Sequence, residues 1–461
     1  MNIIVLTLDT LRAQNMSLHG YSRLTTPHLD RLAQNGVVFN DCYSPWIPTD
    51  PAHTTLFTGK DVFTHQIVTQ HGKAELDEDI HSLAEILKSK GYFTGAADFL
   101  ELWFSRGFDL YEKYVWDVDP ETPMCKAKAV NEKALYLIDQ AVGQDKPFFL
   151  WFHYWDPHSP YLPPGPFNRM FYTGNEKDSG NRSMEAMWQL EAFKGYFDAW
   201  LNGVTDIRFP CALYDGAINY LDSALVQIWN RLQELKLMEE TLLVVLSDHG
   251  EELDEHELWF DHHGLYDTIL KVPLIFHCPG KIPPGKRVGG TVTLLDVAPT
   301  ILELIGLGEL IEEEKMEGRS LVPYFDSSLP SFPQPLFLTE SCWMRKKGVR
   351  TGEWKLIVEW GGTPQHFKRP DVELYDLIAD PGELQNLADE KPKIVKELRA
   401  ELDGWIERRK RETGKPDPHE NQGVSLYWVK LPKGAGQPVV GGAKEEEEEK
   451  LARRLRNLGY E

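Results

Sequence analysis

The chain has 461 residues, of which 42% are hydrophobic and 11% aromatic, which is enough for one large α/β domain with a substantial core and a smaller domain. Its net charge of −22 argues against nonspecific binding to nucleic acid or to an anionic membrane, because both require a basic surface. A small anionic substrate is still compatible with this charge, since a metal ion or a few local donors can set the field inside one cleft.

Cysteine usage and the N-terminal sequence give an expectation about the compartment. The five cysteines are scattered and lack Cys-x-x-Cys spacing, which predicts reduced core thiols and not a disulfide framework or a zinc site. Met1 runs directly into an apolar stretch without a charged leader, and no run of 18 apolar residues exists. We therefore expect a cytoplasmic protein without a membrane span.

The first two thirds of the chain alternate between two kinds of pattern. Short apolar runs predict strands at residues 2–8, 36–40, 92–97, 147–152, 241–246 and 272–276. Helical spacing predicts helices at residues 25–33, 79–91, 127–142, 214–237 and 294–305. This alternation predicts an α/β fold: a doubly wound, mostly parallel sheet covered by helices on both faces.

The pattern changes at about residue 333, where the elements become shorter. Strands at 354–358 and 373–377 predict a small antiparallel sheet, and residues 394–408 predict a closing helix. We therefore divide the chain into a catalytic domain (1–332), an α+β subdomain (333–413), and a polar linker with a charged C-terminal helix (414–461). That last helix is expected to be solvated and is a candidate for contacts in a homo-oligomer.

Polar residues follow several of the predicted strands. Asp9 ends the first strand, the 153–158 stretch follows the fourth, and Asp248 and His249 follow the fifth. Because carboxyl ends of parallel strands share one edge of a sheet, these groups should converge there. Asp and His together suit Mg, Mn, Ca or Zn, although Asp9 has an alternative role as the cap of the next turn.

Thr49 lies where a strand-like run gives way to a helix-like segment. A helix N-terminus favours negative charge, so an anionic ester could be held against this hydroxyl. A divalent ion beside Thr49 would also lower the pKa of the hydroxyl and make it a nucleophile. The alternative is that Thr49 only caps the helix.

Several motifs occur in one order along about residues 2–408. They are residues 9–12 (DTLR), 26–33 (TPHLDRLA), 48–59 around Thr49, 156–161 (DPHSPY), 247–251 (SDHGE), 271–275 (KVPLI), 296–300 (DVAPT), 373–377 (ELYDL) and 380–383 (DPGE). With these motifs the chain resembles the sulfatase family, which belongs to the alkaline phosphatase superfamily.

The chain departs from the family pattern at the nucleophile. Sulfatases carry a Cys or Ser where this chain has Thr49, within a Cys/Ser-x-Pro-x-Arg motif, and His53 replaces the Arg here. The family residue is oxidised to formylglycine, whose hydrated form attacks the sulfate ester. Thr49 cannot give that aldehyde by the same oxidation, because its β-carbon already bears a methyl group, so we expect no formylglycine.

A threonine nucleophile is found in the superfamily's nucleotide pyrophosphatases and phosphoglycerol transferases. The set of Asp9, Thr49, Asp248 and His249 resembles the phosphonate monoester hydrolase and phosphodiesterase branch, whose nucleophile is nevertheless a formylglycine. The resemblance implies that these four residues bind the divalent metal, with Thr49 also the nucleophile.

The resemblance also implies roles for residues around the nucleophile. His158 aligns with a substrate-binding His of the family, and His262 falls where many sulfatases have a Lys that contacts the ester. We expect His158 and His262 to assist catalysis, and Lys60, His65 and His53 to bind substrate. For His65, as for His153, His256 and His263, ordinary hydrogen bonding is an equal alternative.

The sequence thus predicts a metal-dependent hydrolase that acts on a small anionic ester, either a phosphodiester or a phosphonate monoester, through Thr49. Asp156, His158 and His262 are a candidate set for a second metal, although their spacing differs from that of the two-zinc members. One alternative is a sulfatase that lacks formylglycine. The other is a degenerate member that binds an anion without turnover, which His53 in place of Arg keeps open.

Overall fold

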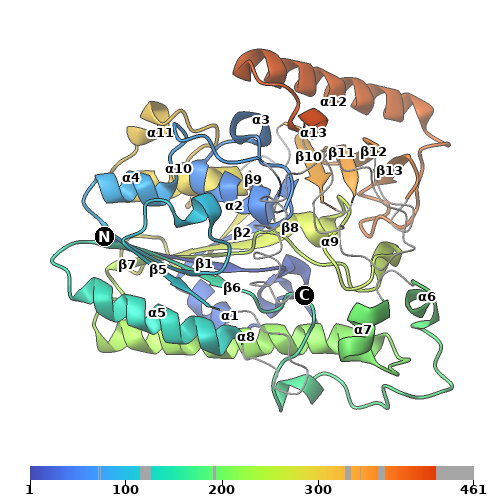
Figure 1. The fold of residues 1–461 in the computed structure, drawn as a ribbon, viewed down its shortest axis with the longest axis horizontal. Helices are drawn as coiled ribbons and strands as arrows, with labels where there is room; N and C mark the ends of the chain where they lie inside the picture. Colours follow the sequence, from blue (N-terminus) through green and yellow to red (C-terminus); the bar gives the residue numbers. More distant parts are fainter. Residues whose placement is uncertain are drawn as a thin grey trace, which may run out of the picture.

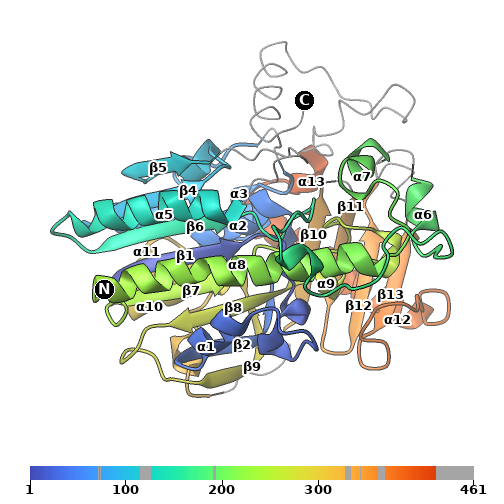
Figure 2. The same ribbon diagram turned by 90° about the horizontal axis from the view of Figure 1, so that it is seen from below.

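The computed structural model describes residues 1–70, 72, 74–114, 126–190, 194–327, 334–342, 344–361 and 369–421. Within these residues, one sheet has eight strands and a second has five (Figures 1 and 2). The eight-stranded sheet has the order β5 (Leu110–Lys113), β4 (Phe93–Asp98), β6 (Phe148–Tyr154), β1 (Asn2–Leu8), β7 (Thr241–Leu246), β8 (Lys271–His277), β2 (Gly36–Tyr43) and β9 (Lys286–Thr293).

The eight-stranded sheet is parallel except at β8. β1 pairs in parallel with β6 and β7, and its apolar residues are buried on both faces, as expected for a central strand. β8 runs antiparallel to both β7 and β2. The carboxyl ends of β4, β6, β1 and β7 therefore share one edge, which is where ligands bind in open α/β sheets.

Helices cover both faces of this sheet, which confirms the predicted α/β class (Figure 1). On one face, α5 contacts β4 and β6, and α8 packs against α5 and α1. α2, α4 and α10 lie on the other face, with α2 in contact with both α4 and α10. The bounds are α1 (Pro27–Ala33), α2 (Thr49–Thr58), α4 (Leu83–Ser89), α5 (Lys126–Val142), α8 (Arg208–Glu234) and α10 (Val297–Leu304).

The second sheet has the order β13 (Val372–Asp376), β12 (Trp354–Glu359), β11 (Arg345–Arg350), β10 (Leu336–Ser341) and β3 (Trp46–Ile47). β12 and β13 pair in antiparallel fashion as predicted, and β10 and β11, which were not predicted, continue the antiparallel order. β3 pairs in parallel with β10. The long helix α12 (Pro392–Thr413) covers this sheet, and the Trp405 ring stacks on Phe337 at 4.7 Å. β3 comes from the predicted catalytic domain and ends two residues before Thr49, so the second sheet helps to place that residue.

The remaining helices are short: α3 (Val62–His65), α6 (Glu185–Trp188), α7 (Lys194–Leu201), α9 (Asp267–Leu270), α11 (Leu310–Glu313) and α13 (Pro418–Asn421). The helix predicted at 79–91 begins only at Leu83, because Ser82 and Glu85 form a capping box there. The charged helix predicted near the end of residues 414–461 lies outside the described residues. Cys42, Cys211, Cys278 and Cys342 are free thiols. Among the described helices, none combines the length and apolar character that crossing a membrane requires.

Candidate active site

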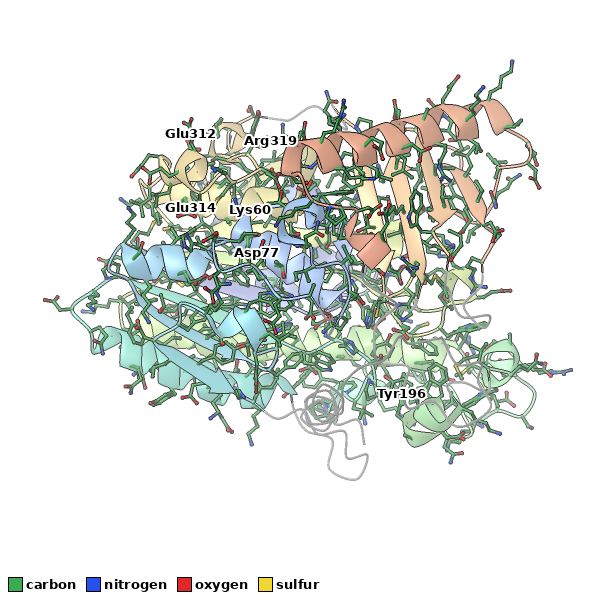
Figure 3. The ribbon with its side chains drawn as sticks, turned by 45° about the horizontal axis from the view of Figure 1, so that its top comes forward. Lys60, Asp77, Tyr196, Glu312, Glu314 and Arg319 are labelled. Atoms are coloured by element: carbon green, nitrogen blue, oxygen red, sulfur yellow. The ribbon has the colours of Figure 1, made fainter. Side chains whose placement is uncertain are left out.

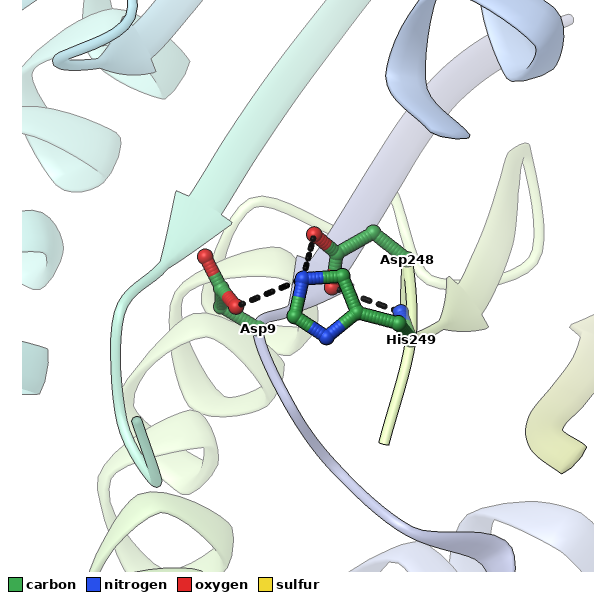
Figure 4. A group of neighbouring side chains, drawn as sticks. All are labelled: Asp9, Asp248 and His249. Atoms are coloured by element: carbon green, nitrogen blue, oxygen red, sulfur yellow. Dashed lines mark hydrogen bonds and ion pairs between the residues drawn. The ribbon is translucent and has the colours of Figure 1, made fainter. Parts of the chain in front are cut away.

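Asp9, Asp248 and His249 meet at the carboxyl edge of the large sheet (Figure 4). Asp9 directly follows β1, and Asp248 and His249 follow the neighbouring parallel strand β7. One ligand atom of each residue lies within 4.8 Å of those of the other two, and all three side chains are buried. The pairing of β1 with β7 therefore places the two strand ends close enough to share one ion.

The carboxylates of this group have unsatisfied oxygens. Asp9 Oδ1 and Asp248 Oδ2 are buried and have no hydrogen-bond partner among the described residues. Burial and the neighbouring Asp248 charge raise the pKa of Asp9 to about 6. Burial alone would raise the pKa of Asp248 too, but His249 and His53 hold it below its usual range. A divalent cation would satisfy both oxygens, so the residues present fit a metal.

His249 is oriented for metal binding by its own backbone. Its Nδ1 donates to the carbonyl oxygen of Gly250 at 2.9 Å, so in the neutral ring Nε2 carries the lone pair. Nε2 lies 3.3 Å from Asp248 Oδ2 and 3.9 Å from Asp9 Oδ1. This is the arrangement in which an imidazole and two carboxylates can ligate one ion.

Thr49 contributes its hydroxyl to the same group. It is the first residue of α2, and its Oγ1 lies 3.2 Å from His249 Nε2. Pro48 occupies the position before the helix and provides no side-chain cap. The interpretation of Thr49 as a helix cap therefore does not hold, because its hydroxyl contacts the ligand group and not a backbone N–H.

His53 lies one turn further along α2, beside the ligand group. Its Nδ1 donates to the Thr49 carbonyl oxygen at 3.0 Å and lies 3.7 Å from Asp248 Oδ2. Burial, helped by the nearby His153, lowers the pKa of His53 to about 4. At neutral pH the ring is uncharged at a position where the family pattern has Arg.

A second histidine bridges two carboxylates next to the ligand group. His153, the penultimate residue of β6, lies with Nδ1 2.7 Å from Asp98 Oδ1 and Nε2 3.3 Å from Asp9 Oδ2. Burial alone would lower the pKa of His153, but its contacts with the two carboxylates raise this pKa to about 10. The sequence analysis did not single out Asp98 as a site residue. Its position at the end of β4, comparable to that of Asp9 directly after β1, was the available signal.

His158 and His262 lie on the other side of His249. The His262 ring stacks on His249 with centroids 4.7 Å apart, and its centroid is 5.0 Å from that of His158. His158 stacks in turn on Trp155, and its Nδ1 donates to the Ser159 carbonyl oxygen at 2.6 Å. The structure therefore places both predicted catalytic histidines beside the ligand group.

Lys60 and His65 are engaged elsewhere. The Lys60 ammonium donates to the carbonyl oxygens of Glu314 and Lys315, which ties the end of α2 to the end of α11 (Figure 3). His65 lies 3.0 Å from Thr55 Oγ1, and burial lowers its pKa to about 3. Neither side chain is brought into the group around Thr49, so the predicted substrate contacts gain no support from their placement.

Comparison with known proteins places the chain in a family. The sequence model of the sulfatase family matches residues 1–307. The family model for the C-terminal region of N-sulphoglucosamine sulphohydrolase matches residues 254–411. The N-acetylglucosamine-6-O-sulfatase of Bacteroides thetaiotaomicron is 24% identical, over 92% of this chain and 88% of that relative. The multifunctional alkaline phosphatase superfamily protein PehA of Trinickia caryophylli is 26% identical, over 72% of this chain and 78% of that relative.

Solved structures share the fold. The phosphonate monoester hydrolase of Agrobacterium radiobacter superposes with a TM-score of 0.68 at 20% identity, covering 88% of this chain and 96% of that one. Because the sulfatase model matches about two thirds of the sequence, the family assignment does not depend on this likeness. The chain belongs to the sulfatase family of hydrolases, within the alkaline phosphatase superfamily.

Proposed function

We propose that this protein is a metal-dependent hydrolase of phosphate esters, either phosphodiesters or phosphonate monoesters, with Thr49 as its nucleophile. One observation carries the proposal: the Thr49 hydroxyl lies 3.2 Å from His249 Nε2, within the Asp9–Asp248–His249 group, where the family has a formylglycine. A threonine in this place keeps a nucleophilic oxygen but excludes the aldehyde.

The residues divide into three roles. Asp9, Asp248 and His249 would hold the ion, which when bound supplies positive charge that lowers the pKa of the Thr49 hydroxyl and polarises the ester. Thr49 Oγ1 loses its proton and attacks phosphorus, and the phosphorus–oxygen bond to the leaving alcohol breaks as that oxygen gains a proton. The remaining group stays esterified to Thr49, as a phosphodiester from a phosphodiester substrate or as a phosphonate ester from a phosphonate monoester. Water then attacks phosphorus, which restores the Thr49 hydroxyl and releases the product.

A threonine restricts how the intermediate can be released. Hydrated formylglycine has a second hydroxyl on the same carbon, so it can release its anion by breaking its own carbon–oxygen bond. Thr49 has one hydroxyl, so its ester must be cleaved by water at phosphorus. His158 and His262 are close enough to His249 to hold the anion or to donate a proton to the leaving oxygen.

A sulfate ester is the second candidate substrate. The similarity to the N-acetylglucosamine-6-O-sulfatase of Bacteroides thetaiotaomicron favours it. The same nucleophile and metal group would serve, with attack at sulfur in place of phosphorus. We retain the cytoplasmic location and a homo-oligomer as predictions.

The test is a panel of nitrophenyl phosphate, phosphodiester, phosphonate and sulfate esters, each assayed with Mn²⁺, Zn²⁺, Ca²⁺ and Mg²⁺. Metal-stripped protein is the control. We expect the highest kcat/KM for a phosphodiester or phosphonate monoester. A sulfate ester as the best substrate would overturn the phosphate preference. If fully metal-loaded protein turns over none of these esters, the protein is better explained as an anion-binding protein. Calorimetry would then measure its affinity for phosphate.

A further inference from the structure

We propose that Glu251, Asp261 and His262 form a second divalent cation site next to the Thr49 group. Glu251 lies two residues after His249, and Asp261 and His262 come from the following loop. Glu252 and Asp261 form an antiparallel bridge, in which Glu252 N donates to the Asp261 carbonyl oxygen at 2.7 Å. This bridge holds the two chain segments together, and one ligand atom of each residue lies within 4.8 Å of the others.

Glu251 is the residue that points to a cation. Its side chain is fully buried, and both carboxylate oxygens are without a hydrogen-bond partner among the described residues. The Tyr161 hydroxyl and the Ser159 backbone face this carboxylate, but neither completes a hydrogen bond of normal geometry with it. A buried carboxylate in this state is costly unless a proton or a cation compensates it.

His262 and Asp261 complete a set with suitable chemistry. His262 Nδ1 is buried without a hydrogen-bond partner among the described residues, and lies 3.7 Å from Glu251 Oε1 and 3.3 Å from Asp261 Oδ1. One imidazole with two carboxylates is a ligand set for Zn²⁺ or Mn²⁺. The separations are those of donor atoms that can turn towards one ion between them.

A further layer of contacts fixes the Asp261 carboxylate. His263 Nε2 lies 3.1 Å from Asp261 Oδ1, and its Nδ1 lies 3.2 Å from Glu340 Oε1 on β10. Such outer contacts orient ligand side chains in metal sites. All the contacts of Asp261 with His262 and His263 use Oδ1, which leaves Oδ2 for an ion.

This set differs from the one considered from sequence. Asp156 Oδ2 accepts a hydrogen bond from the Ala127 backbone at 2.8 Å, so Asp156 is committed to the start of α5. Because the His262 ring stacks on His249, the second ion would lie beside the first, on the side that also holds His158. The inference deepens the proposed function, since a second ion there would bind the same anionic ester, but it does not depend on a phosphate preference.

The test is the metal content of full-length protein, stripped with a chelator, reloaded with Zn²⁺ or Mn²⁺, and desalted. We expect two ions per chain in the wild type. Glu251→Gln keeps the side-chain volume and should reduce the content to one ion, and Asp261→Asn should do the same. Glu257→Gln is the matched control, because it removes an exposed charge from the same loop and should leave two ions.

The outcomes separate the site from its alternatives. One ion in the wild type, lost in Asp248→Asn, would mean that Glu251 is a buried neutral acid and would overturn the inference. Two ions retained in both Glu251→Gln and Asp261→Asn would also overturn it. Melting temperatures show whether a variant is folded, and Asp261→Asn replaces Glu251→Gln if the latter does not fold. Two ions without turnover of any ester would contradict the proposed function alone, and full phosphodiesterase activity with one ion would contradict the second site alone.

Discussion

Replacing Thr49 by alanine separates the chemical role of this residue from its structural role. The substitution removes a hydroxyl whose contact is His249 Nε2, together with one buried methyl group. It removes no helix cap, because α2 begins at Thr49 itself. We expect the free energy of unfolding to fall by about 1 kcal/mol for the lost hydrogen bond and by about 1 kcal/mol for the lost methyl group. A loss of this size lowers the melting temperature by only a few degrees.

The effect on turnover should be far larger. Without the Thr49 oxygen no ester between phosphorus and Thr49 can form, so the two-step route is lost. We expect kcat to fall by about 10³-fold or more, which corresponds to roughly 4 kcal/mol of lost transition-state stabilisation. Thr49→Ser keeps the oxygen next to His249 and should retain activity within about tenfold of the wild type.

Both quantities should be measured on the same samples, with expression in a host that lacks formylglycine-generating enzymes, so that serine stays serine. Melting temperature, metal content and kcat on the best ester from the panel are compared for the wild type, Thr49→Ala and Thr49→Ser. If Thr49→Ala binds metal normally and turns over within a few-fold of the wild type, Thr49 is not the nucleophile.

Three further predictions follow from the structure. Asp248→Ala should remove the bound metal and the activity while the protein stays folded, and full metal occupancy in that variant would contradict the ligand assignment. A mass spectrum of the peptide 44–60 should show an unmodified Thr49, and an aldehyde there would contradict the proposed chemistry. Asp267→Ala should cost about 3–5 kcal/mol in urea unfolding, because it leaves the buried cations of Lys355 and Arg350, which lie 2.6 Å and 2.7 Å from Asp267, without that partner. Burial alone would raise the pKa of Asp267, but these cations hold this pKa well below its usual 3.8. The contribution of the Asp267 carboxylate to the free energy of unfolding is therefore full above about pH 4 and falls as the solution is acidified.

Much of the fold was predictable because apolar runs and punctuating residues determine it locally. β1 and β7 have the predicted bounds, and α2 runs from Thr49 to a left-handed Gly59 at its end. β3 was missed because two residues carry no periodic signal. β11 was missed because it buries Lys346 and Lys347, whose partners Glu373 and Asp417 are distant in sequence.

The site was predictable where strand ends determine it. Asp9, Asp248 and His249 meet because β1 and β7 are neighbours, an arrangement that the shared position after buried strands already indicated. Glu251 was visible within the SDHGE motif, but nothing local shows that its carboxylate would be buried without a partner. The substrate-binding role of Lys60 stays a prediction, and nothing local in the sequence indicates that its ammonium donates to the carbonyl oxygens of Glu314 and Lys315, just after α11.

The replacement of the family's Arg by His53 changes how an anionic ester must be held. An arginine offers several N–H donors to an anion, and its charge is permanent. His53 already spends its Nδ1 proton on the Thr49 carbonyl oxygen, so in the neutral ring Nε2 can only accept a hydrogen bond. It therefore cannot replace the arginine as a donor to a phosphoryl or sulfuryl oxygen. Burial also lowers the pKa of His262, so its ring does not supply the missing charge. Under the proposed function, the positive charge that such an ester requires would come from cations at the Asp9–Asp248–His249 group and at the neighbouring Glu251–Asp261–His262 set.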